Sequence, residues 1–163
     1  MSELVDKEAF TQAMRRWASG VTILTSCADG EIHGMTVSAF SSVSADPPLV
    51  LVCANQSSTT HGVIQAGGIF AVNILAADQD ELSTRFAFTD AAERFEGVPW
   101  TQGSTGAPLL VGSLVQVECR VRSAHLEGSH CIYIGEVLHT FVRADAEPLL
   151  YFDGAYRRLA PKA

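Results

Sequence analysis

Lysine is nearly absent from this sequence: Lys7 and Lys162 are the only two. Arginine does not compensate, because lysine and arginine together number 11 against 18 aspartates and glutamates, a formal net charge of −7 at pH 7. Nucleic acids and anionic membranes are bound mainly by clustered basic residues. We therefore expect no nucleic acid and no membrane among the partners.

Long apolar runs and a secretory leader are also missing. The longest apolar stretches, such as residues 49–54, are far shorter than the roughly 20 residues that a membrane-spanning helix needs. Residues 1–6 contain no basic region followed by an apolar one, as a signal peptide would. The sequence thus predicts a cytoplasmic protein.

Several signatures of metal and catalytic sites are absent too. No two cysteines form a Cys-x-x-Cys pair, and neither cysteines nor histidines have the spacing of metal ligands, so we expect no metal site. The glycine-rich dinucleotide fingerprint is missing, which excludes nicotinamide binding in a Rossmann fold, and so is the Gly-x-Ser-x-Gly elbow. The four cysteines are predicted to be reduced core thiols: Cys27, Cys53, Cys119 and Cys131.

Apolar residues are what the chain does contain. They make up 47% of its 163 residues, whereas charged residues make up 18%. An average soluble domain has roughly 25% charged residues. The length suits one domain, which we place at residues 1–163. Because so few residues are charged, we expect part of the surface to be buried against another copy of the chain.

The spacing of the apolar residues predicts a mainly β fold. Helices are expected at residues 6–18, 59–66 and 78–88. Strands are expected at residues 21–27, 32–40, 49–54, 69–75, 114–122, 131–142 and 149–152, with an irregular segment at 89–108. Since turns such as Asp29-Gly30 join most consecutive strands, an antiparallel barrel with peripheral helices fits better than a doubly wound sheet.

Side-chain patterns place three of these elements relative to a core. The strand at 49–54 is uniformly apolar and is predicted to be fully buried. The strand at 114–122 alternates, which puts Cys119 on the core face and Glu118 on the solvent face. The first helix has an apolar stripe, which we expect to pack on the protein's own core rather than on a second copy: Phe10, Met14 and Trp17.

Residues 34–44 are small and hydroxylated, at a point where a strand ends and a loop begins. Small side chains let a flat ligand approach the backbone, whose N–H and C=O groups can bond to the edge of that ligand. On this pattern alone, a Ser/Thr-rich strand end with nothing bound is the alternative.

A second polar segment, Asn-Gln-Ser-Ser-Thr-Thr at residues 55–60, lies between a predicted strand and a predicted helix. Hydroxyls and free N–H groups at a helix N-terminus form an anion site that suits a phosphate. Ser and Thr are also the preferred capping residues, so an ordinary helix cap is the alternative. His61 and Arg85 are candidate charge partners for a phosphate.

The third segment, Gly128-Ser129-His130, is a turn that leads into a long strand. A histidine at such a turn could orient a substrate or move a proton. Most single histidines at strand starts do neither, and the pattern alone leaves both interpretations open.

Taken in order, these motifs resemble the short-chain flavin reductases, the reductase components of two-component flavin monooxygenases. The resemblance covers about residues 8–159. It rests on the ordered set Gly34-Met35-Thr36-Val37-Ser38, Asp46-Pro47-Pro48-Leu49, Phe70-Ala71-Val72-Asn73, Gly106-Ala107-Pro108-Leu109, Gly128-Ser129-His130 and Gly135-Glu136-Val137.

The resemblance implies an FMN-binding split β-barrel, antiparallel and Greek-key-like, that forms a homodimer with two flavin sites near the subunit interface. It implies that the first polar segment lines the isoalloxazine ring, that the second holds the ribityl and phosphate groups, and that two helix residues lie nearby. The cofactor-binding residues so implied are Thr36, Val37, Ser38, Ala39, Ser41, Ala54, Asn55, Gln56, Ser57, Ser58, Thr59, Thr60, Phe86 and Ala87.

The resemblance also makes His130 the candidate catalytic residue, because it matches the last residue of the family's Gly-Asp-His motif near the nicotinamide; Ser129 stands here in place of Asp. The implied activity is reduction of FMN or FAD by NADH or NADPH, with the reduced flavin passed to a partner monooxygenase. His130 would orient the nicotinamide or the edge of the flavin. It is not expected to act as a general acid, because hydride transfer needs no protein proton in the same step. Two alternatives are a flavin-retaining oxidase or oxygenase on the same barrel, and a flavin-binding protein without turnover.

Overall fold

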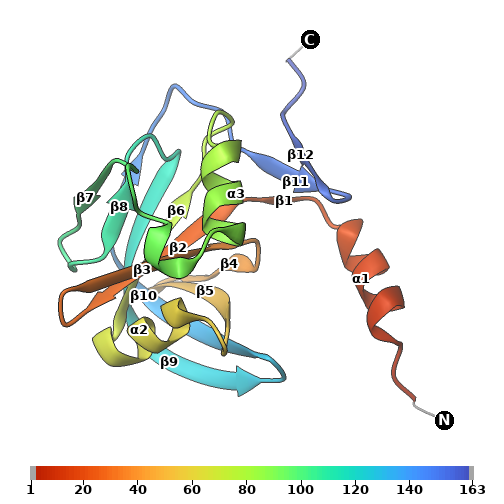
Figure 1. The fold of residues 1–163 in the computed structure, drawn as a ribbon, viewed down its shortest axis with the longest axis horizontal. Coiled ribbons are helices and arrows are strands. Elements are labelled where there is room, and N and C mark those ends of the chain that lie inside the picture. The colour runs from red at the N-terminus through yellow and green to blue at the C-terminus, as the bar shows by residue number, and fades with distance from the viewer. Residues whose placement is uncertain (1–2, 162–163) are drawn as a thin grey trace.

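One seven-stranded sheet forms the centre of the fold, and every pairing in it is antiparallel, in the order β3-β2-β6-β9-β10-β5-β4 (Figure 1). A computed structural model describes residues 3–161, so the ends of the predicted domain, 1–2 and 162–163, lie outside it. The strands are β2 Thr22–Ala28, β3 Glu31–Val37, β4 Phe40–Ala45, β5 Pro48–Asn55, β6 Ile69–Ile74, β9 Val115–Glu127 and β10 His130–Val142. The predicted mainly β, antiparallel fold is confirmed.

The two edges of this sheet lie close together without pairing. The edge strands β3 and β4 follow each other in the chain, and only Ser38 and Ala39 separate them. Even fully extended, this linker reaches about 11 Å, so the sheet must curl until its edges nearly meet. The barrel is therefore split between β3 and β4. The single strand predicted at 32–40 is wrong in this respect, because the chain changes edges at the linker.

Two smaller sheets border the barrel. One contains β1 Ser19–Gly20, β11 Leu150–Phe152 and β12 Ala155–Arg157. The other is the hairpin of β7 Trp100–Gln102 and β8 Pro108–Leu110. The segment predicted to be irregular, 89–108, therefore contains β7 as well as a short 3₁₀ helix at Ala91–Glu93.

Two helices pack against the sheet. Helix α2, Thr59–Gly67, begins after Ser58, whose hydroxyl accepts the N–H of His61, and ends at Gly68 in the left-handed conformation. Helix α3, Asp80–Phe88, packs against β3, where the ring of Phe86 lies against the bare backbone of Gly34. The helices predicted at 59–66 and 78–88 are confirmed to within about two residues.

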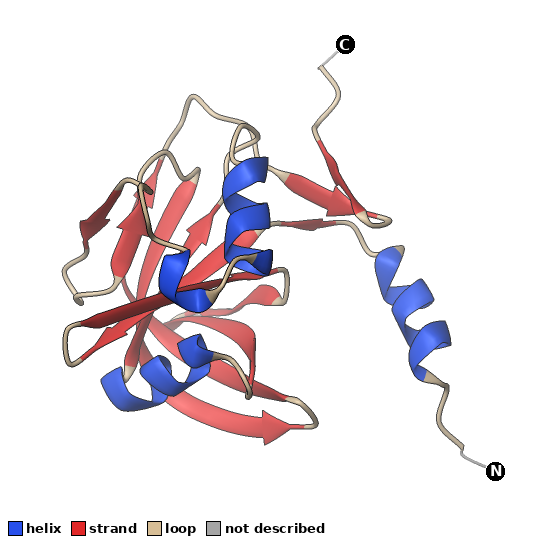
Figure 2. Ribbon diagram, in the orientation of Figure 1, coloured by secondary structure: helices blue, strands red, loops and turns tan. Residues whose placement is uncertain are grey.

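Helix α1, Lys7–Arg15, stands apart from the barrel, as Figure 2 shows. It is attached at its C-terminal end, where Arg16 forms an ion pair with Asp153 at 3.0 Å. None of the helix residues is buried. The apolar stripe is exposed: Phe10 by 56%, Met14 by 53% and Trp17, just after the helix, by 77%. The prediction that this stripe packs on the protein's own core is therefore wrong.

Two apolar clusters fill the space around the sheet. The larger one includes Leu24, Phe70 and Tyr133. The second one lies toward α3 and includes Ile23 and Phe86. Leu24 and Ile23 are neighbours on β2, so this strand contributes to both clusters through its alternate faces.

Two predicted burial patterns are wrong. Strand β5 is not buried on both faces: Val52 and Ala54 are buried, whereas Leu51 and Cys53 are half-exposed on the other face. Glu118 does not face solvent, because it is only 5% exposed. The segment before β8 covers the Glu118 side chain. The N–H and the hydroxyl of Thr105 both donate to Oε2 of Glu118, each at 2.8 Å.

The cysteines are free thiols, and all four lie within the described residues. Cys119 and Cys131 are buried in the larger apolar cluster, as predicted, whereas Cys27 and Cys53 are half-buried and lie outside both clusters. Among residues 3–161, no helix has both the length and the apolar character needed to cross a membrane.

Candidate active site

Three of the predicted segments meet at the carboxyl end of β5. The linker at the split is joined to β5 by the N–H of Cys53, which donates to the carbonyl oxygen of Ala39 at 3.1 Å. Two residues further along β5, Asn55 is the pairing partner of His130 at the start of β10. The polar segment 55–60 then leads directly into α2. One strand end therefore gathers the linker, the polar segment and the candidate catalytic histidine.

The linker presents backbone donors at the split. Ser38 and Ala39 are exposed, and their N–H groups donate no hydrogen bond to any other residue among 3–161. Just before them, Thr36 Oγ1 donates to the carbonyl oxygen of Ser83 on α3 at 2.6 Å, which fixes the end of β3 against that helix. A flat, hydrogen-bonding ligand would therefore find two uncommitted donors on a braced backbone.

Two clefts open beside Ser38. One, of about 330 Å³, is bordered by α3 and the β11–β12 hairpin, and its lining includes Thr36 and Ala87. The other, of about 530 Å³, is bordered by the end of α1 and by β4, and its lining includes Ala39 and Ser41. Tyr151 lines both clefts. The sequence pattern placed this tyrosine only in the last predicted strand, 149–152, and gave no sign of its role at the clefts.

The polar segment 55–60 forms a cradle built from neutral groups. Asn55 Oδ1 accepts hydrogen bonds from the N–H and the hydroxyl of Ser57, at 2.9 and 2.8 Å. Ser58 Oγ donates to the carbonyl oxygen of Asn55 at 2.8 Å and accepts the N–H of His61 at 3.1 Å. By helix geometry, the N–H groups of Thr59 and Thr60 have no acceptor within α2. Ser58 therefore does cap the helix, as the alternative interpretation expected. The N–H groups of Thr59 and Thr60 nevertheless stay free to bind an anion.

Thr60 provides the test of whether this cradle suits a phosphate. Its hydroxyl is buried and is one of two buried side-chain polar atoms in residues 3–161 that have no hydrogen-bond partner. An unsatisfied buried hydroxyl is costly unless a ligand or water completes it. Together with the free N–H groups at the start of α2, it fits the phosphate of a flavin nucleotide.

Both candidate charge partners form hydrogen bonds elsewhere in the protein. The Nδ1 atom of His61 is hydrogen-bonded to the hydroxyl of Tyr133 at 2.8 Å, inside the barrel. Burial raises the pKa of Tyr133 above its ordinary value, with the neighbouring Cys131 as a second cause. Arg85 donates to three carbonyl oxygens between the end of α3 and β7. The sequence motifs did not reveal the pair of His61 and Tyr133.

The turn between β9 and β10 presents His130 to solvent. The Oγ atom of Ser129 lies 2.8 Å from Nδ1 of His130, so the residue that replaces the family's Asp is in contact with the ring. On the other side of the turn, the side-chain amide of Gln56 donates to the carbonyl oxygens of Gly128 and His130, each at 3.1 Å. Gln56 therefore contacts the turn directly.

The predicted cofactor-binding residues differ in accessibility. Four are covered by protein: Val37, Ala54, Thr60 and Phe86. Phe86 packs edge-on against Phe95, with ring centroids 5.0 Å apart, so its side chain supports α3. The remaining predicted residues are exposed or half-buried, and they lie on the linker, on the adjoining strand ends of β3 and β4, on the cradle or on α3. Direct contact with a flavin remains a prediction for each of these residues.

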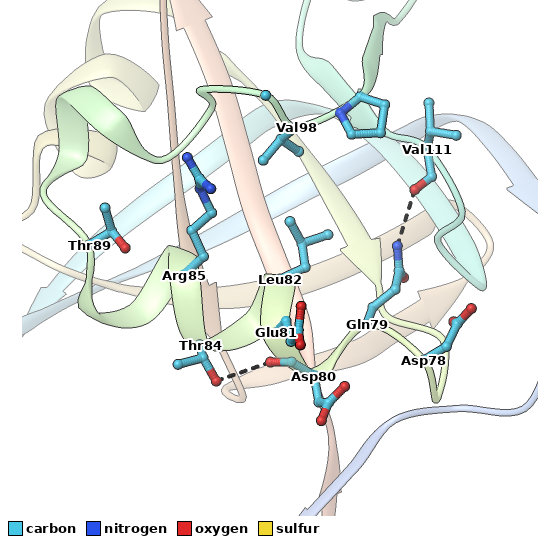
Figure 3. Close-up of a pocket in the computed structure, with 12 residues that line it drawn as sticks. Asp78, Gln79, Asp80, Glu81, Leu82, Thr84, Arg85, Thr89, Val98 and Val111 are labelled. Carbon is cyan, nitrogen blue, oxygen red and sulfur yellow. Dashed lines mark hydrogen bonds between the residues drawn. The ribbon is translucent and has the colours of Figure 1, made fainter.

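A further cleft contains none of the predicted cofactor-binding residues, although the candidate charge partner Arg85 lines it. It has a volume of about 690 Å³ and lies between the first turns of α3 and the segment before β7 (Figure 3). Three acidic residues, Asp78, Asp80 and Glu81, line it against one cation, Arg85, so its net charge opposes binding of a phosphate. Gln79 is committed to the carbonyl oxygen of Val111 at 3.1 Å. The size of this cleft therefore does not mark it as the nucleotide site.

An antiparallel split barrel with free N–H donors at the split and at the start of α2 is an arrangement compatible with a flavin-binding oxidoreductase. The family model described as "Flavin reductase like domain" matches residues 14–160. The chain belongs to this family, which confirms the resemblance found in the sequence.

Individual relatives agree with this assignment. The chain is 34% identical over 160 residues to the flavin-dependent monooxygenase reductase subunit HsaB of Rhodococcus jostii RHA1, covering 98% of this chain and 82% of that protein. It is 39% identical over 155 residues to the FMN reductase (NADH) SmoA of Agrobacterium fabrum, covering 95% and 87%. The solved structure of the NADH:FAD oxidoreductase SgcE6 of Streptomyces globisporus, in complex with NAD and FAD fragments, superposes with a TM-score of 0.91 at 34% identity over 99% of both chains.

Proposed function

We propose that this protein is an NAD(P)H-dependent flavin reductase that supplies reduced FMN or FAD to a partner monooxygenase. The observation that carries the proposal is the meeting of linker, cradle and His130 at the end of β5. The relatives support it, because HsaB is named a monooxygenase reductase subunit, SmoA an FMN reductase (NADH) and SgcE6 an NADH:FAD oxidoreductase. The proposed unit is a single domain acting in the cytoplasm, a compartment that suits four free thiols.

The cradle is assigned to the phosphate end of the flavin. The N–H groups of Thr59 and Thr60 and the buried hydroxyl of Thr60 supply the donors, and the positive end of the α2 dipole adds to them. Ser57 and Ser58 shape the loop through their bonds to Asn55.

The linker is assigned to the ring of the flavin. The flavin ring itself supplies the redox chemistry, which is acceptance of a hydride from reduced nicotinamide. The N–H groups of Ser38 and Ala39 would stabilise negative charge that develops at the edge of the ring. Thr36 holds the linker against α3, so these donors keep their position.

His130 is assigned to the nicotinamide. It is exposed at the end of β10, and Ser129 Oγ holds its Nδ1 at 2.8 Å. In that arrangement the ring orients the incoming nucleotide. No proton transfer is required of it.

We infer further that two copies pair through α1 and the outer face of the sheet. The stripe of Phe10, Met14 and Trp17 is exposed in a single copy. The outer face of β5 and β10 is also apolar and half-exposed, and includes Leu51 and Ile132. Pairing would bury both surfaces, and a sedimentation experiment should then give about twice the chain mass of 17.4 kDa.

The experiment that tests the function follows absorbance of the reduced nicotinamide, with catalytic protein and each pairing of NADH or NADPH with FMN or FAD. We expect rapid oxidation that saturates with added flavin, which also fixes both specificities. No turnover with any pairing, in protein shown to bind flavin, would contradict the proposal. A flavin that stays bound through purification would then favour the oxidase, and weak binding without turnover would favour the carrier.

A further inference from the structure

One residue of the cradle is bonded to three consecutive carbonyl oxygens of the β9–β10 turn. The backbone N–H of Gln56 donates to Ser129 at 3.0 Å. Its side-chain Nε2 donates to Gly128 and to His130, each at 3.1 Å. All three residues of the turn motif thus have their carbonyl oxygens satisfied by Gln56.

The turn itself does not require these bonds. Gly128 and Ser129 form a two-residue hairpin loop in which Gly128 has φ +56° and Ser129 does not have positive φ, which suits a turn with glycine in its first central position. The tip is exposed, as are the neighbouring Leu126 and Glu127. Carbonyl groups at an exposed hairpin tip are ordinarily satisfied by water. Gln56 provides a protein donor to both carbonyl oxygens of the two-residue tip, Gly128 and Ser129, and this fixes the position of the tip.

The bonds of Gln56 determine what its side chain can do. Both hydrogens of its amide group are directed to carbonyl oxygens of the turn, so no amide donor remains for a phosphate in the cradle. Within the same turn, Ser129 holds the histidine ring, because its Oγ lies 2.8 Å from Nδ1 of His130. A continuous series of hydrogen bonds therefore runs from the cradle to the imidazole.

We propose that Gln56 is a positioning residue, which clamps the turn 128–130 and thereby sets the location of His130 relative to the flavin cradle. The proposal rests on the proposed function, since it assigns His130 to the nicotinamide. It departs from the sequence expectation for Gln56, which placed this residue in direct contact with the flavin. In this arrangement the two nucleotide sites keep a fixed spacing without sharing a ligand contact.

The test replaces Gln56 with methionine, which has similar length and no charge or donor; the backbone bond to Ser129 is retained. Gln65→Met is the matched control, because Gln65 is an exposed residue of the same helix region. For Gln56→Met we expect the KM for NAD(P)H to rise roughly tenfold, the effect of losing about two hydrogen bonds. The Kd for FMN, from quenching of flavin fluorescence, should change by no more than about twofold.

A second readout needs no turnover. In the flavin-free protein, ¹⁵N order parameters of residues 128–130 should fall from about 0.85 toward about 0.6 in Gln56→Met and stay unchanged in the control. Ser129→Ala keeps the clamp and removes the last bond of the series, so it should raise the KM for NAD(P)H and leave these order parameters unchanged.

Three results would overturn the proposal. Equal losses in FMN and NAD(P)H affinity would make Gln56 a ligand contact. A mobile turn with an unchanged KM would show that the clamp does not serve His130. Order parameters unchanged by Gln56→Met would show that there is no clamp. Failure of the proposed function is a separate outcome, because the wild-type protein would then oxidise no NAD(P)H with any flavin while the order-parameter measurement still tests the clamp.

Discussion

The hydroxyl of Tyr133 lies 2.8 Å from Nδ1 of His61, and this buried hydrogen bond joins β10 to the first turn of α2. Tyr133→Phe removes the hydroxyl and leaves the histidine nitrogen without its partner. We expect the free energy of unfolding to fall by about 1–2 kcal/mol, measured by urea denaturation. An unchanged unfolding midpoint would show that the bond makes no net contribution.

His130→Ala separates nicotinamide binding from flavin binding. The side chain is exposed, so folding should be little affected. We expect the KM for NAD(P)H to rise roughly tenfold, while FMN binds as in the wild type. Steady-state rates at low NAD(P)H, together with a fluorescence titration of FMN, measure the two effects. An unchanged rate at low NAD(P)H would rule out the role assigned to this residue.

Thr60→Val tests the phosphate assignment through opposite effects on stability and binding. The mutation replaces a buried hydroxyl that has no partner with a methyl group of similar size. The flavin-free protein should therefore gain about 1 kcal/mol of stability, whereas FMN affinity should fall roughly tenfold through the lost bond to phosphate. Thermal unfolding without flavin and an FMN titration check both. Stabilisation with unchanged FMN affinity would mean that the hydroxyl faces the core alone.

The thiol of Cys119 should make the free energy of unfolding depend on pH in the alkaline range. Burial, and secondly the adjacent Glu118, raise the pKa of its thiol from 9.0 to about 12. Between these values the unfolded chain releases the proton while the folded chain retains it, so stability is complete below pH 9 and falls as the pH rises toward 12. The slope is ~1.4 kcal/mol per pH unit for one such group. In Cys119→Ala the free energy of unfolding should fall less steeply with pH. Burial also raises the pKa of Tyr133, so this tyrosine should account for the pH dependence that remains.

Much of the barrel was predictable because its strands alternate or end at clear turns. Strand β2 was found from its β-branched run, and the hairpin at Asp29-Gly30 was confirmed. The exchange of edges at Ser38 was not predictable, since small residues continue the pattern of β3 into β4 without interruption. Glu118 was misplaced for a different reason: alternation describes a strand in isolation, and the loop residue Thr105, 13 positions earlier in the chain, covers this carboxylate.

The candidate site was predicted as three separate segments, and the fold brings them together. Two pairings bring the segments together: Asn55 with His130, and Cys53 with the linker. Asn55 and His130 are more than 70 positions apart in the chain, so the sequence alone does not show that they are neighbours. The apolar stripe on α1 was visible in the sequence, but periodicity cannot show which surface covers a stripe. The clamp by Gln56 left no signal, because a glutamine between polar residues is unremarkable in composition.

A phosphate cradle without a lysine or arginine should respond unusually to ionic strength. Residues 55–60 supply only uncharged groups, and the whole chain has a net charge of −7, which repels an anionic nucleotide. Salt weakens that repulsion, and no ion pair in the cradle exists for it to weaken. FMN affinity should therefore hold steady or rise slightly between about 0.05 and 0.5 M salt, so flavin exchange should work equally well at low and at high ionic strength.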